Sequence, residues 1–314
     1  MASPTSKAPP YAAAHFALEL DNNTDGGLFR SIEGGGVKSD VMTYQQGGIY
    51  DRWRQVGKIK FEDIKLQVGM SMSQMFYTWV ADFFAGKATR KDGAIVAADF
   101  KYQARARREF KSAMIKELSF PKLEGKDTSA AYMNVTVAVE DIQFLKGDEQ
   151  KLQQATLDNQ KTWSANNFHF TIDGFEACTD ECSKVDGFTV KQTLVEYHSG
   201  GRRGPTLTPS GMDFPNLSFY IPEPYCEPLL KWYKERAMER GAPAGNRLNG
   251  SITTFDNDTT ELFTLSFFNA DIINVAPDKA EATTEDVKHI KFDIVTERME
   301  FKNTETPGGN KAVS

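Results

Sequence analysis

An internal repeat constrains this chain more than any other feature of its sequence. Residues 31–48 read SIEGGGVKSDVMTYQQGG and residues 184–201 read KVDGFTVKQTLVEYHSGG, so the second segment follows the order and spacing of the first at an offset of 153. Shared binary patterning alone can make unrelated strands look alike, but a run that also shares order and residue type indicates duplication. The aligned pairs include Gly34 with Gly187, Tyr44 with Tyr197, Phe61 with Phe214, and Trp79 with Trp232.

The similarity continues through both halves with small changes of offset, which are typical of insertions in loops. The later pairs are Phe110 with Phe267 at an offset of 157, and Val135, Val137 and Val139 with Ile290, Phe292 and Ile294 at 155. The sequence therefore predicts two domains of one fold. The predicted divisions are a flexible N-terminal tail (1–14), domain one (15–146), a polar, helix-compatible linker (147–166), domain two (167–302) and a flexible C-terminal tail (303–314).

Each repeat reads as strands around one helix. Alternating apolar residues predict a strand at 15–20, and further strands are predicted at 37–45 and 58–68, the latter with a bulge at 62–63. The spacing of apolar residues predicts a helix that starts at Ser71 or Ser73 and ends at Gly86, with its copy at about 224–240. Trp79 and Trp232 are the predicted core anchors of these helices. The remaining strands are expected at 97–104, 111–118 and 133–144, with copies at 248–255, 262–273 and 289–301.

These patterns predict a mainly β fold with one helix per repeat, built as a tandem pair of β-sandwich or small-barrel domains. No apolar run approaches about 18 residues, so no membrane-spanning helix is expected, and we expect synthesis in the cytoplasm without classical export. The net charge of −6 argues against broad capture of nucleic acid.

Few residue patterns point to chemistry. The histidines (His15, His169, His198 and His289) form no HxxxH or HxH pair, and the cysteines (Cys178, Cys182 and Cys226) form no CxxC pair. The Gly34-Gly35-Gly36 run lacks the P-loop pattern, and no GxSxG elbow is present. Three basic residues (Arg105, Arg107 and Arg108) are expected in a loop that faces solvent or a neighbouring subunit, with contact to nucleic acid as the sharper alternative. We predict no enzyme, no metal site and no cofactor.

The order of elements resembles the tail tube protein family of contractile phages and phage-like injection particles, with the Hcp tube protein of type VI secretion as a more distant relative. The resemblance rests on a G-x-x-V-x-x-x-x-x-x-Y-x-x-G-G element, then a strand leading into one amphipathic helix, then three strands, and it covers residues 15–146 and again 167–302. In that family the turn after the second strand leads to a loop that reaches neighbouring subunits. The corresponding candidates here are Tyr44, Gly47, Gly48, Tyr50, Trp53, Tyr197, Gly200 and Gly201.

The resemblance implies a structural subunit that assembles into stacked rings and forms a conduit for DNA or a protein payload. The alternative is a tube-initiating or adaptor ring of the tail or baseplate. The implied partners are further copies of the chain and the sheath, baseplate or tail-terminator proteins, with no membrane. The implied location is a virion tail or a phage-like particle assembled in the host cytoplasm. This chain departs from the family in carrying two copies of the domain.

The resemblance implies rings of roughly six domains, and two arrangements of a two-copy chain preserve that number. Three chains can alternate their copies in one pseudo-sixfold ring, or six chains can build two stacked rings, and a linker of about 20 residues reaches far enough for either. The trimer is preferred, because it keeps lateral strand contacts within one chain.

We also expect an acidic or neutral inner wall, because a basic channel would hold DNA in place. The candidates are Asp40 and Thr43 in the first copy and Thr193 and Glu196 in the second. Residues three apart share a face of a strand only where a bulge intervenes, so one member of each pair is expected to face the lumen. The competing interpretation is that these residues are solvated on an outer face.

Overall fold

The computed structural model describes residues 15–21, 27, 29–45, 47, 50–70, 72–152, 163–201, 204–238, 247–278 and 287–304 of the 314. These residues form a mainly β fold, as predicted. The elements of the first half are β1 (His15–Leu20), β2 (Ser31–Gly34), β3 (Val37–Tyr44), β4 (Trp53–Phe61), β5 (Ile64–Val68), α1 (Gln74–Phe84), β6 (Lys91–Ala98), β7 (Ala104–Phe120), β8 (Leu123–Glu124), β9 (Met133–Ala138) and β10 (Asp141–Lys146).

The second half follows a similar order and adds the short helix α2 after its first strand. Its elements are β11 (Phe168–Ile172), α2 (Glu176–Thr179), β12 (Lys184–Val185), β13 (Phe188–Tyr197), β14 (Thr206–Asp213), β15 (Leu217–Pro222), the 3-10 turn η2 (Glu223–Tyr225), α3 (Glu227–Tyr233), the π-helical turn η3 (Lys234–Met238), β16 (Leu248–Phe255), β17 (Glu261–Pro277), β18 (His289–Val295) and β19 (Arg298–Asn303).

Strands pair in one pattern in both halves. The first half runs β1-β6-β7-β9-β5-β2, with β10 also on β7, and the second runs β11-β16-β17-β18-β15-β12, with β19 also on β17. The register repeats as well. Ile64 pairs with Val137 as Leu217 pairs with Ile294, at offsets of 153 and 157. The offset of 155 expected for the strand containing Val137 is therefore wrong. An offset of 157 relates β6, β7, β9 and β10 of the first half to β16, β17, β18 and β19 of the second.

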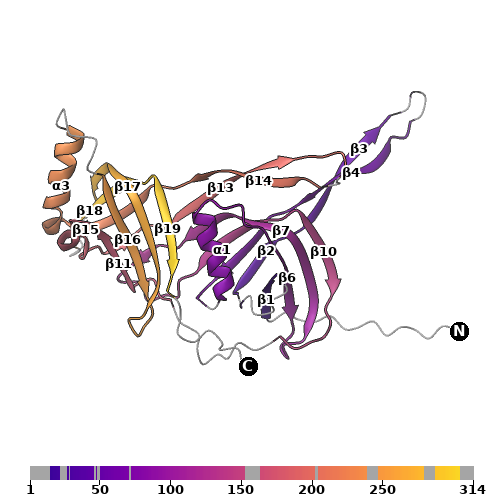
Figure 1. The fold of residues 1–314 in the computed structure, drawn as a ribbon, viewed down its shortest axis with the longest axis horizontal. Helices are drawn as coiled ribbons and strands as arrows, with labels where there is room; N and C mark the ends of the chain where they lie inside the picture. The colour runs from indigo at the N-terminus through magenta and orange to yellow at the C-terminus, as the bar shows by residue number, and fades with distance from the viewer. Residues whose placement is uncertain are drawn as a thin grey trace.

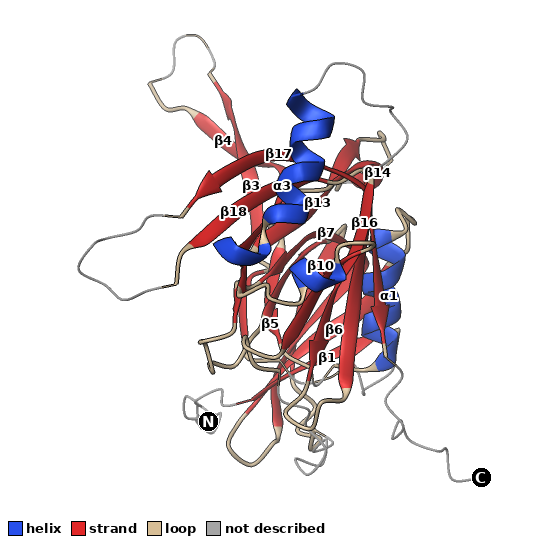
Figure 2. Ribbon diagram, turned by 90° about the vertical axis from the view of Figure 1, so that its left-hand side faces the viewer, coloured by secondary structure: helices blue, strands red, loops and turns tan. Residues whose placement is uncertain are grey.

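The two halves share one framework. β13 pairs with β7 and β12 pairs with β8, so strands of the second half extend sheets of the first. Figure 1 shows β13 and β14 running from the second half across the first, with α3 at one end of the molecule and β3 and β4 projecting at the other. Buried apolar side chains of both halves form one continuous cluster. Figure 2 shows α1 standing against one side of the strand layers.

The sequence predicted α1 well. The Ser73 side chain accepts a hydrogen bond from the backbone N–H of Phe76, which caps the helix, and Gly86 follows its end at φ +67°. Phe76, Trp79 and Val80 are buried along the predicted apolar face. Here the local capping signals and the apolar periodicity agree with the tertiary packing.

The second helix is less regular than its counterpart. Pro224 lies in η2 and Pro228 lies in the first turn of α3, where a missing backbone N–H costs nothing. The helix then widens into the π-helical turn η3. Gly241, the expected helix end, lies outside the described residues. The helix predicted at 224–240 is therefore a short α-helix between a 3-10 turn and a π-helical turn.

Several predicted strands are divided or displaced in the structure. The strand predicted at 58–68 is β4 and β5, which part at Glu62-Asp63 because β4 pairs with β3 while β5 pairs with β2 and β9. The strands predicted at 133–144 and 289–301 are likewise two strands each, β9 with β10 and β18 with β19. The strand predicted at 97–104 is wrong, because β6 ends at Ala98 and a turn precedes β7. Apolar periodicity marks strand residues but not the partner that each strand chooses.

The predicted linker enters the core at its described end. Residues 153–162 lie outside the described residues, but Trp163 is buried, with its ring 5.2 Å from that of Phe263. The backbone N–H of Ala131 donates to the carbonyl of Trp163, at 2.8 Å. This end of the linker therefore packs against both halves.

Candidate assembly surface

The hairpin of β3 and β4 carries the predicted loop residues of the first half. Among the described residues these two strands pair only with each other, and every residue of β3 is exposed. The side chains of Tyr44 and Trp53 are 67% and 61% exposed, and Tyr50 is fully exposed. Gly47 lies in the turn, and Gly48 lies outside the described residues. Figure 1 shows this hairpin extending away from the sheets.

The hairpin of β13 and β14 repeats this construction. Tyr197 pairs with Thr206 as Tyr44 pairs with Trp53. Each hairpin also has one register shift, which lies between Ser39 and Val41 in the first hairpin and between Thr193 and Leu194 in the second. Tyr197 is exposed, and Gly200 and Gly201 lie in the turn beyond it. Unlike β3, β13 has a second partner. It pairs with β7 from Phe188↔Phe120 to Lys191↔Glu117.

A small apolar cluster lies beneath the second hairpin. Leu207 of β14 and Leu194 of β13 pack against Met114 of β7 and Ala138 of β9. Beside them the hydroxyls of Ser119 and Thr189 are 2.8 Å apart, and Lys191 lies 3.7 Å from Glu117. The hairpin is therefore held by strand pairing, an apolar contact and polar side chains together.

An arginine–glutamate pair grips the outer edge of this hairpin. Arg90 Nη2 donates to the backbone carbonyl of Leu207, and the backbone N–H of Leu207 donates to Glu140 Oε1 at 2.8 Å. The two side chains face each other, with Arg90 Nε 3.7 Å from Glu140 Oε1. Both hydrogen-bonding groups of one edge residue are thus satisfied by a charged pair, and such charge-assisted bonds are among the stronger ones. We call this arrangement the Arg90–Glu140 clamp.

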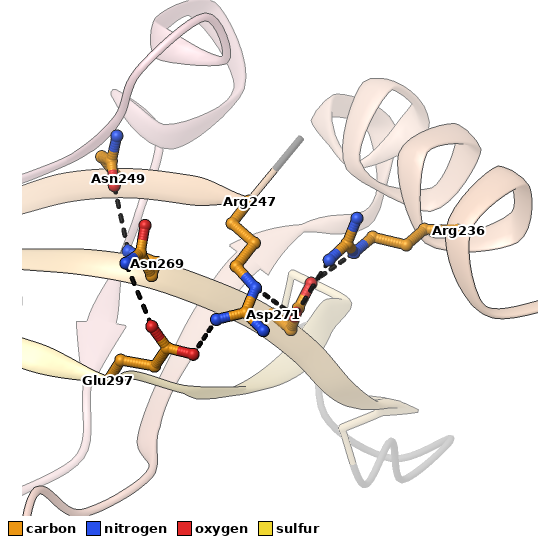
Figure 3. Close-up of polar contacts among 6 residues, drawn as sticks. All are labelled: Arg236, Arg247, Asn249, Asn269, Asp271 and Glu297. Carbon is orange, nitrogen blue, oxygen red and sulfur yellow. Dashed lines mark hydrogen bonds and ion pairs between the residues drawn. The ribbon is translucent and has the colours of Figure 1, made fainter. Parts of the chain in front are cut away.

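The second half carries the matching pair at an offset of 157. Arg247 contacts Glu297 directly, and Arg247 Nε lies 3.5 Å from Asp271 Oδ2 (Figure 3). Arg236 of η3 also binds Asp271, with Nη2 donating to Oδ2 at 3.1 Å. Asp271 stands where Met114 stands in the first half, at the same offset.

The same network joins the neighbouring turn. Asn269 Nδ2 donates to Glu297 Oε2 at 3.0 Å, and the backbone N–H of Asn269 donates to Asn249 Oδ1 at 3.0 Å (Figure 3). Asn269 has φ +54°, as its counterpart Ser112 has φ +51°. The network therefore fixes the edge of β17 beside α3 and η3.

A second contact between the halves involves α1 and β19. The ring of Phe301 stacks on those of Tyr77 and Phe84, with centroids 6.5 and 5.9 Å away. Asn303 Nδ2 donates to Gln74 Oε1 at 3.2 Å.

The predicted anchor Trp79 is 2% exposed, with Nε1 donating to the carbonyl of Thr89. Trp232 is half-buried on α3 with the Arg236 guanidinium over its ring.

The predicted lumen candidates are all exposed on the two hairpins. Asp40 and Thr43 lie on β3, with Asp40 3.4 Å from Lys60, and Thr193 and Glu196 lie on β13. The extra residue at the register shift belongs to β4 in the first hairpin and to β14 in the second. Side chains along β3 and β13 therefore alternate between the two faces without interruption. Glu196 therefore shares a face with Leu194, while Thr193 points to the opposite face.

The basic cluster is not in a loop as predicted. Arg105, Arg107 and Arg108 all lie in β7. Arg105 lies 2.8 Å from Asp99, Arg107 binds Glu19 at 2.6 Å, and Arg108 donates to the carbonyl of Gly34. Internal partners occupy all three, which weakens the idea that they bind nucleic acid.

The described titratable side chains form no cluster of the kind that binds a metal ion. Within the described residues, no group of three or more His, Cys, Asp or Glu side chains could hold a metal ion. Burial raises the pKa of the Cys178 thiol to about 11, and that of the buried Cys226 thiol to about 12. Such thiols are protonated and weakly nucleophilic at neutral pH. No helix in the described part of the chain is both long and apolar enough to cross a membrane.

Sequence reasoning missed the residues that hold the hairpin. The motifs and periodicities of the sequence single out neither Arg90 nor Glu140. The repeat itself contains a signal for both, because an offset of 157 aligns Arg90 with Arg247 and Glu140 with Glu297. An arginine and a glutamate thus stand at matching places in the two halves.

Three solved structures that this chain matches each cover less than half of it. A chain of the sheath–tube complex of an extracellular contractile injection system, PVC, in its extended state is 15% identical, with 44% of this chain and 92% of that chain covered and a TM-score of 0.38. A tube-terminating cap of the anti-feeding prophage is 15% identical, with 46% and 97% covered and a TM-score of 0.39. A baseplate chain of the same prophage is 11% identical, with 43% and 91% covered and a TM-score of 0.33.

Comparison with curated proteins gives no match. The model of one protein family does match the sequence, over residues 12–143, which include every element from β1 to β9 and the start of β10. That family is described as the T4-like virus tail tube protein gp19. The first half of this chain, over residues 12–143, is therefore similar in sequence to the tail tube proteins of T4-like viruses.

Proposed function

We propose that this chain is a structural subunit of a phage-type tail tube, carries two copies of the tube domain and acts without catalysis. The observation that carries the proposal is the family match over residues 12–143 together with the second half, which repeats the strand order of that segment. Its role is to assemble into stacked rings around a conduit for DNA or a protein payload.

Several independent features support two copies of one domain. The pairing order, the register of β5 on β9 and of β15 on β18, and the register shift in each hairpin all recur. A close approach recurs too, since Gly93 and Gly250 both lie against the backbone of the neighbouring strand. Shared binary patterning does not account for matched irregularities, whereas duplication does.

The proposed tube uses its exposed strand edges. An unpaired edge is a liability in a soluble protein, because it invites association with another chain. In a ring each edge is closed by a neighbouring domain, as β13 already closes the edge of β7 within this chain. The proposed partners beyond the chain itself are sheath, baseplate or tail-terminator proteins of the same particle.

The proposed lumen is lined by the hairpin faces that point away from the sheets. In the second half Leu194 packs against the body, so the opposite face of β13 carries Thr193, and its counterpart on β3 is Asp40. This leaves Asp40 and Thr193 as the residues that line the lumen. Thr43 and Glu196 lie on the opposite faces of the strands, which point toward the sheets. A map of the assembled particle tests the point, and a channel lined by Arg and Lys would contradict it.

Negative-stain microscopy of the purified full chain tests the proposed function. Long polymers with a central channel are expected from a tube protein. Single rings that do not stack would favour the adaptor-ring alternative. A monodisperse monomer at every concentration would contradict both forms of the proposal.

A further inference from the structure

We propose that a second copy of the chain binds head to tail, repeating between chains the contact that joins the two halves within one chain. The β3–β4 hairpin of one copy extends β17 of the next copy, whose Arg247 and Glu297 hold the backbone of β4, while α3 of that next copy packs against β10 of the first. The inference deepens the proposed function, since it rests on the two-copy architecture and names the binding surfaces.

The internal contact supplies the template for the strand pairing. Within the chain β13 adds to β7 over Glu117–Phe120, and the corresponding part of β17 is Asn274–Pro277, at an offset of 157. Among the described residues that part of β17 pairs only with β18. β3 has the same register on β4 as β13 has on β14, and it has no other described partner. The template places Val37 of one copy opposite Val275 of the next, as Val190 lies opposite Leu118.

The clamp has its own counterpart at this second site. Leu207, gripped by Arg90 and Glu140, corresponds to Arg54 of β4 at an offset of 153. In the isolated chain Arg247 and Glu297 contact each other directly, whereas Arg90 and Glu140 lie 3.7 Å apart and each also binds a backbone group of Leu207. Arg247 and Glu297 thus have the composition of the clamp, but among the described residues they bind no backbone group of a hairpin strand.

The pair of residues beneath the hairpin changes from apolar to charged at the proposed contact. Under the internal hairpin Leu207 packs on Met114. The same two places in the contact between copies hold Arg54 and Asp271, which bear opposite charges. Beside them Leu194 and Ala138 correspond to Val41 and Val295, two apolar side chains that are exposed in the single chain. Arg54 would therefore join Arg236 and Arg247, which already bind the Asp271 carboxylate, beside a small apolar contact.

The second surface shows the same relation. In the internal contact Phe301 of β19 stacks on α1, and Asn303 bonds to Gln74. At an offset of 157, Phe301 corresponds to Phe144, which is 60% exposed on β10, and Asn303 corresponds to Lys146. At an offset of 153, Gln74 corresponds to Glu227. Phe144 would then lie against Leu230 of α3, with a salt bridge beside it. Figure 1 shows α3 at the opposite end of the molecule from β10 and from the β3–β4 hairpin, as head-to-tail binding requires.

Reversal of the Lys146–Glu227 pair tests the contact in the full chain. Lys146→Glu should weaken self-association about 2- to 5-fold per contact in sedimentation velocity, the range of an exposed ion pair. The double variant Lys146→Glu/Glu227→Lys should restore it, because the charges again oppose each other. Both side chains are exposed, so thermal melts should show little change in folding. Failure of the double variant to recover would count against the contact.

Phe144→Glu provides a stronger perturbation with a matched control. It should weaken self-association about tenfold or more, because it places a charge in the centre of an apolar contact. Phe100→Glu changes a side chain that is 75% exposed and lies outside both proposed surfaces, so assembly should be unaffected. Equal effects of the two substitutions would overturn the α3–β10 contact.

Engineered cysteines test the strand register. The variant Val37→Cys/Val275→Cys, oxidised with copper phenanthroline, should give a ladder of cross-linked chains on a non-reducing gel, because residues opposite each other in paired strands lie within disulfide reach. Each single variant reports the background from the three native cysteines and should give no ladder.

These outcomes separate the contact from the proposed function. Tubes that form without the cross-link and tolerate Phe144→Glu would overturn the contact alone. Cross-linked, charge-rescued assemblies that remain open chains without a channel would overturn the tube function and leave the contact standing.

Discussion

Thr89 links two side chains at the end of α1. Its carbonyl accepts a hydrogen bond from Trp79 Nε1, and its hydroxyl donates to Asp82 Oδ2 at 2.9 Å. Lys87 also binds Asp82, at 2.7 Å. The sequence predicts Trp79 from apolar periodicity, but these polar partners lie beyond the helix and follow from the turn that Gly86 begins.

Trp79→Ala should destabilise the chain by about 3–5 kcal/mol, because it removes a large, fully buried side chain and leaves a cavity. Urea unfolding measures the effect. Trp53→Ala is the matched control on the exposed hairpin and should change the free energy of unfolding by less than about 0.5 kcal/mol. An unchanged midpoint for Trp79→Ala would show that the helix does not anchor the core.

Asp82→Asn should lower stability at neutral pH and have no effect in acid. The hydrogen bond from Lys87 is the main cause that holds the pKa of Asp82 below its usual range. A carboxyl with a lowered folded-state pKa stabilises the fold above its unfolded pKa of about 3.9, and that stability is lost as pH falls through the folded-state pKa. The difference between the variants should be about 0.5–1 kcal/mol at pH 7 and vanish well below pH 4. A difference that persists in acid would show another cause.

At the scale of elements, the closeness of β1 to β6 and of β11 to β16 depends on glycine. A Cβ at Gly93 would lie 2.2 Å from the Glu19 carbonyl and 2.7 Å from the Phe110 ring. A Cβ at Gly250 would lie 2.1 Å from the Thr171 carbonyl and 2.5 Å from the Phe267 ring. Both strands shift register next to the glycine. The aromatic ring fills the space that a side chain would need.

Gly93→Ala and Gly250→Ala should therefore each cost about 1–3 kcal/mol or more, because backbone atoms must move to admit the methyl group. Gly211→Ala on β14 is the control, since nothing lies within 4 Å of its Cβ position. Thermal melts of the three variants give the comparison. A neutral result at one of the first two sites alone would show that the halves are not built alike there.

At the scale of the whole molecule, the β13–β14 hairpin decides how the halves sit. It leaves its own half and pairs with β7, while α1 of the first half packs on β19. The halves are therefore side by side and exchange contacts in both directions, and the far ends carry the unused hairpin and the unused helix (Figure 1). A stack of one half above the other would not use these edges.

We expect three chains per ring, because the alternating halves of three chains supply roughly six lateral contacts of one kind. With 35.1 kDa per chain, mass photometry should show a species near roughly 105 kDa. Averaged images should show pseudo-sixfold symmetry. A ring of six chains at about twice that mass, with true sixfold symmetry and one chain per position, would contradict the expectation.

The sequence by itself determined the mainly β class, the repeat at an offset of 153 and the capped helix α1. These depend on local capping, periodicity and identity of residues, which are properties of short segments. The sequence predicts a bulge at 62–63, but the tertiary structure decided that β4 and β5 take different partners there and that Trp163 enters the core. It also decided that Arg90 and Glu140 hold Leu207, because these results depend on partners such as Val137, Phe263 and Leu207 that lie far away in the chain. A sequence pattern fixes which face of a strand is apolar, but long-range pairing fixes which edge receives another strand.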